Sequence, residues 1–119
     1  MKILVVEDNF PIADGLKYLL ETAGHGVVGM AGNVEDALRL VDATTFDLAL
    51  LDIDLHGESV SPVAERALKR GKPVIFLSGY GETDMLASDL RELPRLEKPV
   101  DPSELLAAIE RALAPTSAR

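Results

Sequence analysis

The sequence predicts an α/β fold in which a doubly wound sheet of five parallel strands is flanked by five helices. Short apolar runs alternate along the chain with segments whose apolar residues recur at helical spacing. The inner runs are continuously apolar, which is typical of parallel strands covered by helices on both faces. The 119 residues suit a single domain with its own core.

Three strands are predicted in the first half of the chain, at residues 3–6, 27–30 and 48–51. After the first strand, apolar residues from Ile12 to Ala23 describe one helix face that ends at Gly24. After the second strand, Asn33 can cap a helix whose apolar side continues to Val41. The order strand, helix, strand, helix therefore repeats from the N-terminus.

The second half continues the pattern with strands at 74–77 and, more weakly, at 95–97. Ser61 and Pro62 open a third helix, and a short fourth helix is predicted at 83–90. Asp101, followed by a proline and then by a glutamate at the third helical position, opens the last helix. We expect residues 1–114 to form the domain and residues 115–119 to form a short tail.

Composition excludes several classes of function. The net charge of −8 disfavours direct binding to nucleic acid or to a membrane surface, both of which require clustered Lys and Arg. There are no cysteines, which excludes disulfides and thiolate chemistry. No apolar run is long enough to cross a membrane, and the apolar stretch at the N-terminus is too short for a secretion signal. A cytoplasmic protein is expected.

Acidic side chains follow two of the predicted strands. Glu7 and Asp8 come after the first strand, and Asp52 and Asp54 come at the end of the third. In a flavodoxin-like sheet with strand order 2-1-3-4-5, these two strand ends meet at the switch point where ligands bind. Clustered carboxylates repel one another, and a hard cation such as Mg²⁺ offsets that charge. Asp54 taken alone is equally well explained as solvated surface.

Two more strand ends carry polar groups suited to phosphate. Ser78 directly follows the fourth strand, and Lys98 follows the fifth and precedes Pro99. Each has a plain alternative, as a turn residue or a surface lysine. Together with a metal-bound aspartate, however, a hydroxyl and an ammonium group form a phosphoryl clamp, because phosphoryl transfer depends on neutralised charge and positioned oxygens.

This set of residues, in this order and on these strand ends, resembles the CheY-like receiver domain of two-component response regulators over about residues 2–114. The resemblance implies that Asp52 accepts a phosphoryl group from a sensor histidine kinase or a histidine phosphotransfer protein. It also implies that Mg²⁺ is held by Glu7, Asp8, Asp52 and the backbone carbonyl of Asp54. The phosphoryl oxygens would be contacted by Lys98 and Ser78. The peptide bond between Lys98 and Pro99 would be cis.

One position departs from the family pattern. Receivers usually carry Tyr or Phe three residues before the lysine, and here that position is Arg95. The stretch PVIFLSGYGE, residues 73–82, instead resembles the FAT GUY subgroup of receivers, which also lack this ring and are often stand-alone. Gly79 and Tyr80 in this stretch are therefore secondary site candidates. His56 and His25 are interpreted as exposed loop residues.

The resemblance predicts a phospho-switch that acts through protein contacts or as a phosphate sink, with no catalysis beyond phosphoryl transfer onto itself and slow autodephosphorylation. Two alternatives stay open. Asp52 and Asp54 also resemble the DxD motif of haloacid-dehalogenase-type phosphatases, although that motif normally follows the first strand of a larger domain. The second alternative is a pseudo-receiver, which keeps the fold but is never phosphorylated. The sequence leaves the downstream partner and homodimerisation open.

Overall fold

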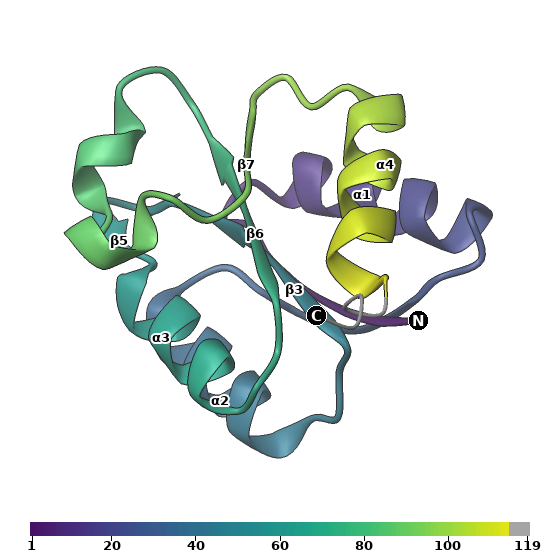
Figure 1. Cartoon of the computed structure of the whole chain (residues 1–119), viewed down its shortest axis with the longest axis horizontal. Helices are drawn as coiled ribbons and strands as arrows, with labels where there is room; N and C mark the ends of the chain where they lie inside the picture. Colours follow the sequence, from purple (N-terminus) through teal and green to yellow (C-terminus); the bar gives the residue numbers. More distant parts are fainter. Residues whose placement is uncertain (115–119) are drawn as a thin grey trace, which may run out of the picture.

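A five-stranded parallel sheet forms the centre of the protein in the computed structural model, which describes residues 1–114 (Figure 1). The predicted tail, residues 115–119, lies outside the described residues. The strand order is β2-β1-β3-β6-β7, which confirms the predicted order 2-1-3-4-5. The strands are β1 (Lys2–Val6), β2 (Gly26–Ala31), β3 (Leu48–Asp52), β6 (Val74–Ser78) and β7 (Arg95–Glu97).

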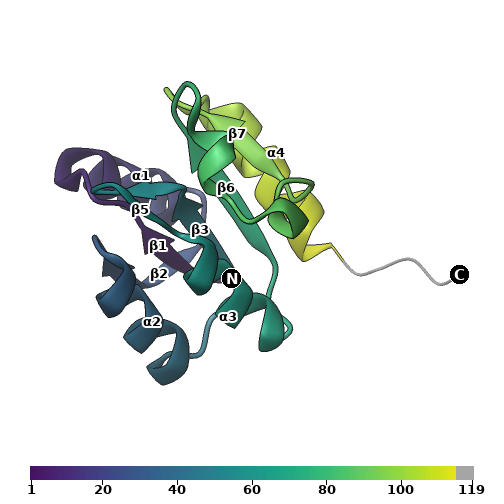
Figure 2. The same ribbon diagram turned by 90° about the vertical axis from the view of Figure 1, so that its left-hand side faces the viewer.

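Helices cover both faces of this sheet (Figure 2). One face carries α1 (Phe10–Thr22) and α4 (Pro102–Leu113), and the other carries α2 (Val34–Ala43) and α3 (Ser61–Lys69). Three of the helices begin at a side chain that accepts a hydrogen bond from a backbone N–H of the first turn, which offsets an unsatisfied donor there. These capping residues are Asn9, Asn33 and Asp101.

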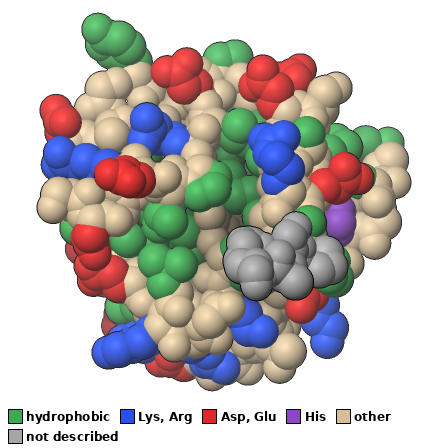
Figure 3. Space-filling view, viewed as in Figure 1, with side chains coloured by type: hydrophobic (Ala, Val, Ile, Leu, Met, Phe, Trp, Pro, Cys, Tyr) green, Lys and Arg blue, Asp and Glu red, His purple; other side chains and the backbone are tan. Residues whose placement is uncertain are grey.

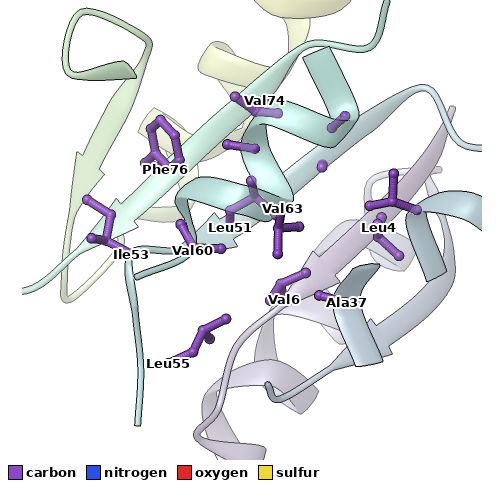
Figure 4. Packing of buried hydrophobic residues seen from close by; sticks show 14 of the residues in the cluster. Leu4, Val6, Ala37, Leu51, Ile53, Leu55, Val60, Val63, Val74 and Phe76 are labelled. Atoms are coloured by element: carbon purple, nitrogen blue, oxygen red, sulfur yellow. The ribbon is translucent and has the colours of Figure 1, made fainter. Parts of the chain in front are cut away.

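The core has two halves, one on each side of the sheet. Leu4, Leu51 and Phe76 pack toward α2 and α3 (Figure 4), while the intervening strand residues pack toward α1 and α4. Every residue of β3 and β6 is buried. Because consecutive side chains of a strand point to opposite faces, burial of both faces requires the continuous apolar runs seen in the sequence.

The predicted helix at residues 83–90 is wrong. Two short 3₁₀ turns, η1 (Glu82–Met85) and η2 (Ser88–Leu90), replace it, so residues 1–114 contain four α-helices where five were predicted. Leu86 and Ala87 between the turns are extended. The amide of Ala87 donates to the Ser61 hydroxyl at 3.0 Å, so it is not available for a helical hydrogen bond.

A small antiparallel hairpin, which the sequence did not predict, follows β3. It consists of β4 (Asp54–Leu55) and β5 (Glu58–Ser59). Its two turn residues, His56 and Gly57, have φ values of 53° and 87°, as a tight hairpin turn requires. This hairpin fixes the backbone that leaves Asp52.

Acidic and basic side chains are interspersed on the face of the molecule shown in Figure 3, without a continuous basic surface. This agrees with the charge balance of the sequence. No helix within residues 1–114 combines the length and the apolar character needed to pass through a bilayer.

Candidate functional site

Three carboxylates meet at the carboxyl edge of the sheet. Glu7 and Asp8 follow β1, and Asp52 is the last residue of β3. Val6 pairs with Leu51 across these two strands, so the residues that follow are neighbours. One oxygen of each of the three carboxylates lies within 4.8 Å of the others. Glu7 and Asp52 are only 4% and 2% exposed.

Asp54, the fourth acid expected at this edge, turns its side chain elsewhere. Its carboxylate accepts the Gly57 N–H at 2.7 Å and so closes the β4–β5 hairpin. The role that the resemblance implies for Asp54 uses its backbone carbonyl, and the backbone of Asp54 pairs with Ser59 in this hairpin.

Lys98 supplies the positive charge of the site. Its Nζ lies 2.9 Å from Oε1 of Glu7 and 3.1 Å from Oδ2 of Asp52. The backbone N–H of Lys98 donates to the carbonyl of Ser78 at 2.8 Å, which extends the pairing of β6 and β7 to this point. The peptide bond between Lys98 and Pro99 is cis, as the resemblance implies.

Burial and mutual repulsion change the ionisation of these groups. Desolvation, together with the charge of Glu7, raises the pKa of Asp52 to about 8 in spite of the opposing contact with Lys98. Desolvation acts to lower the pKa of Lys98, but its hydrogen bonds with Glu7 and Asp52 outweigh this and raise it. Desolvation acts to raise the pKa of Asp8, yet hydrogen bonds with Glu7 and the His56 amide lower it overall.

The donor set fits a small, hard divalent cation. Oδ1 of Asp52 is buried and has no hydrogen-bond partner among residues 1–114. An unpartnered buried carboxylate oxygen is costly, and a cation would satisfy it. The three side chains Glu7, Asp8 and Asp52 offer only oxygen ligands, the kind that Mg²⁺ and Ca²⁺ prefer. Mg²⁺ usually binds one or two carboxylates and otherwise keeps waters, which suits a site where, of the three acids, only the Asp8 side chain, 20% exposed, reaches solvent.

The end of β6 contributes the remaining predicted residues. Ser78 is 2% exposed at the end of the strand, and Asp52 pairs with Leu77 one residue before it. Gly79 follows, and its N–H donates to the Glu82 carboxylate at 2.8 Å. The Tyr80 side chain is fully exposed and contributes nothing to the buried cluster.

Sequence reasoning missed two contacts. Glu82 was not singled out, although a glutamate three residues after Gly79 has the spacing of a capping box. His56 is exposed as predicted, but its N–H donates to Oδ2 of Asp8 at 3.1 Å and its Nδ1 lies 3.5 Å from the same oxygen. His25, predicted to be exposed, is half-buried, and desolvation, together with the charge of the N-terminus, lowers its pKa.

An apolar groove adjoins the site between α1 and the loop after β7. It has a volume of about 320 Å³, and Lys98 forms one wall. Ile12, which is 39% exposed, lies in this groove. The remaining lining residues are Gly15, Leu16, Leu19, Pro99, Val100 and Pro102.

Comparisons with known proteins agree with the geometry. A family model described as the response regulator receiver domain matches residues 3–110. The transcriptional regulatory protein PdtaR of Mycobacterium tuberculosis is 30% identical over 115 residues, which cover 94% of this chain and 56% of PdtaR. DltR of Streptococcus agalactiae is 35% identical over 113 residues, covering 92% of this chain and 50% of DltR. The chain spans about half the length of these curated relatives.

Two solved structures are similar along nearly their whole length. The solution structure of SdrG from Sphingomonas melonis matches with a TM-score of 0.83 and 35% identity, covering 96% of this chain and 97% of SdrG. A receiver domain protein (CheY-like) from Methanospirillum hungatei matches with a TM-score of 0.80 and 30% identity, covering 94% of this chain and 92% of that one.

Proposed function

Because the chain belongs to the response regulator receiver family, we propose that Asp52 accepts a phosphoryl group in a Mg²⁺-dependent reaction. One observation carries this proposal: the buried carboxylate of Asp52 contacts Lys98 and lies within 4.8 Å of ligand oxygens of Glu7 and Asp8, and one of its own oxygens has no hydrogen-bond partner among the described residues. A carboxylate in this position can attack phosphorus while cationic groups offset the charge of the phosphoryl oxygens.

In the proposed step an oxygen of Asp52 forms a bond to phosphorus while the bond from phosphorus to the donor breaks. The donor atom is a histidine nitrogen of the phosphorylated partner, and it leaves with the bonding electron pair. Asp52 must be ionised to attack. Bound Mg²⁺ would supply positive charge that favours the ionised carboxylate and pairs with phosphoryl oxygens.

Each remaining residue has a proposed task. Glu7, Asp8 and the backbone carbonyl of Asp54 would hold the metal with Asp52. Lys98 would contact phosphoryl oxygens, because its Nζ already lies 3.1 Å from Asp52. Ser78 would bind the phosphoryl group and report its presence to the surface around Tyr80. Residues 1–114 would form the complete receiver domain.

Acetyl phosphate tests this function without a partner protein. Incubated with acetyl phosphate and Mg²⁺, the protein should gain the mass of one phosphoryl group, and the gain should disappear when a chelator is added. Asp52→Ala should keep the fold, checked by circular dichroism, and should not be labelled. Labelling of that variant to the wild-type level would contradict the assignment of Asp52, and an unlabelled wild-type protein would favour the pseudo-receiver.

The proposed phosphoryl donor is a sensor histidine kinase or a histidine phosphotransfer protein. The apolar groove beside Lys98 supports this, because a partner that delivers a phosphoryl group to Asp52 must approach over this edge of the sheet. Burial of exposed apolar surface would stabilise the complex. The proposed output is a contact with another protein, or storage of phosphate, in the cytoplasm.

Ile12→Asp should separate the two kinds of phosphoryl donor. A charge placed in the groove should slow transfer from a phosphorylated histidine phosphotransfer protein by roughly tenfold or more, since apolar anchors dominate such interfaces. The rate with acetyl phosphate should not change. Tyr18→Asp, at an exposed position of α1 that does not line the groove, is the matched control. Equal slowing with both donors would show that Ile12 supports the site itself and does not dock the partner.

The phosphatase alternative loses its support. The family match makes the chain a receiver domain, and the Asp54 carboxylate, which would act as acid and base in a DxD phosphatase, is bonded to Gly57 in the hairpin. A chromogenic phosphate ester checks this. We expect no sustained turnover, and turnover that Asp54→Asn abolishes would restore the phosphatase reading.

A further inference from the structure

Glu82 holds the backbone amide that follows Ser78. Its Oε1 accepts the Gly79 N–H at 2.8 Å. Its Oε2 lies 2.9 Å from the position that a Cβ of Gly79 would occupy, so the carboxylate lies directly against the glycine backbone. An anion therefore already occupies this donor in the unphosphorylated protein, in a charge-assisted hydrogen bond.

The position of β6 in the sheet decides what this contact means. β6 lies between β3 and β7, yet Lys98, which follows β7, reaches Asp52 at the end of β3. The Lys98 side chain thus crosses above the end of β6. An anion bound to Asp52 and Lys98 together must lie above that same strand end, where Ser78 and Gly79 are.

We propose that the Glu82 carboxylate occupies the amide of Gly79 in competition with a phosphoryl group on Asp52, so that phosphorylation displaces Glu82. This inference rests on the proposed function of Asp52. Two anions cannot share one N–H donor without strong repulsion, so a phosphoryl group on Asp52 that accepts the Gly79 N–H breaks the Glu82 contact. Glu82 therefore lowers the stability of the phosphorylated state relative to the unphosphorylated state.

Displacement of Glu82 has a consequence at the surface. Glu82 begins η1, and between it and Gly79 lie the fully exposed Tyr80 and Gly81, whose φ is 77°. The Glu82 N–H bond to the Gly79 carbonyl is long, at 3.4 Å, so the carboxylate provides the shorter contact across this turn. Leu86, which is 2% exposed, anchors the chain further on. Release of Glu82 therefore changes the presentation of Tyr80 and leaves the core in place.

Beryllofluoride, an unreactive phosphoryl mimic, tests the competition in the presence of Mg²⁺. Glu82→Ala should bind it roughly three- to tenfold more tightly than wild type, because no internal anion has to be displaced. Glu82→Gln, which keeps a neutral acceptor, should lie between the two. Asp84→Asn removes one charge from the same exposed turn and is the matched control; its affinity should stay at the wild-type value.

Gly79→Ala tests the same contact from the other side while keeping the charge of Glu82. The added Cβ would push away the flexible end of Glu82, so this variant should also bind beryllofluoride more tightly. The double variant with Glu82→Ala should gain no more than the larger single effect, since both changes remove one contact. Bound beryllofluoride should also shift the Gly79 amide signal of the wild type in nuclear magnetic resonance spectra.

Three outcomes would overturn the proposal: wild-type affinity in Glu82→Ala, an equal gain in Asp84→Asn, or additive gains in the double variant. In each of these cases labelling of Asp52 by acetyl phosphate would leave the proposed function standing. A wild-type protein that neither binds beryllofluoride nor becomes labelled would overturn the proposed function and this proposal together.

Discussion

Replacing Lys98 by alanine should lower the free energy of unfolding by about 2 kcal/mol at pH 8 in metal-free buffer. Lys98 lies against two buried carboxylates, at 2.9 Å and 3.1 Å, and its removal leaves both without a counter-charge. The same variant should accept phosphoryl groups from acetyl phosphate about 100-fold more slowly, because a positioned donor to the transferred group is lost. Urea denaturation and intact-protein mass measurement give the two quantities.

Lys69→Ala is the control for this prediction, because Lys69 is an exposed lysine at the end of α3. It should change neither stability nor labelling appreciably. If Lys98→Ala were labelled at the wild-type rate, Lys98 would hold the acids together in the unphosphorylated protein without contacting the transferred group.

Replacing Asp52 by asparagine should stabilise the metal-free protein, by on the order of 2 kcal/mol at pH 8. The pKa of Asp52 is about 8 in the folded protein against an ordinary value of 3.8. Between these values the folded protein binds more protons than the unfolded chain, so wild-type stability should fall as the pH rises from about 4 to about 8. Asparagine carries no charge, so this loss should be absent from the variant.

Urea denaturation at a series of pH values, with a chelator present, measures this difference. The gain from Asp52→Asn should be small near pH 4 and grow toward pH 8. Asp14→Asn, which removes an exposed acid of α1, should give a nearly constant difference over the same range. If Asp52→Asn raised the free energy of unfolding equally at pH 4 and pH 8, repulsion and desolvation of the Asp52 carboxylate would not be the source of the stabilisation.

The sheet of this CheY-like fold was predictable because its signals are local and strong. Continuous apolar runs reflect burial on both faces, and the runs ending at Val6 and Leu51 gave the two strands that bring the acids together. The convergence of Glu7, Asp8 and Asp52 then followed from topology alone. Lys98 was found in the same way, as the polar residue at the end of the last strand.

The parts that sequence reasoning missed depend on tertiary contacts. The apolar residues at 83–90 fit a helix. However, the backbone amide of Ala87 donates a hydrogen bond to the Ser61 hydroxyl, 26 positions earlier in the chain, and this contact interrupts the helix. Each strand of the hairpin after β3 is only two residues long, which is too short to show an alternation of apolar and polar residues. The contact of Glu82 with Gly79 crosses an irregular turn, so the three-residue spacing of a capping box is its only sequence signal and no periodicity supports it.

The central claim is that the acids at this edge of the sheet bind a divalent cation. A magnesium titration monitored by nuclear magnetic resonance spectroscopy tests this claim most directly. We expect the amide signals of Asp8, Ile53 and His56 to shift along one saturable curve, and Asp8→Asn to weaken the affinity by more than about tenfold. Amide signals that stay in place at high magnesium, or a curve that Asp8→Asn does not alter, would contradict it.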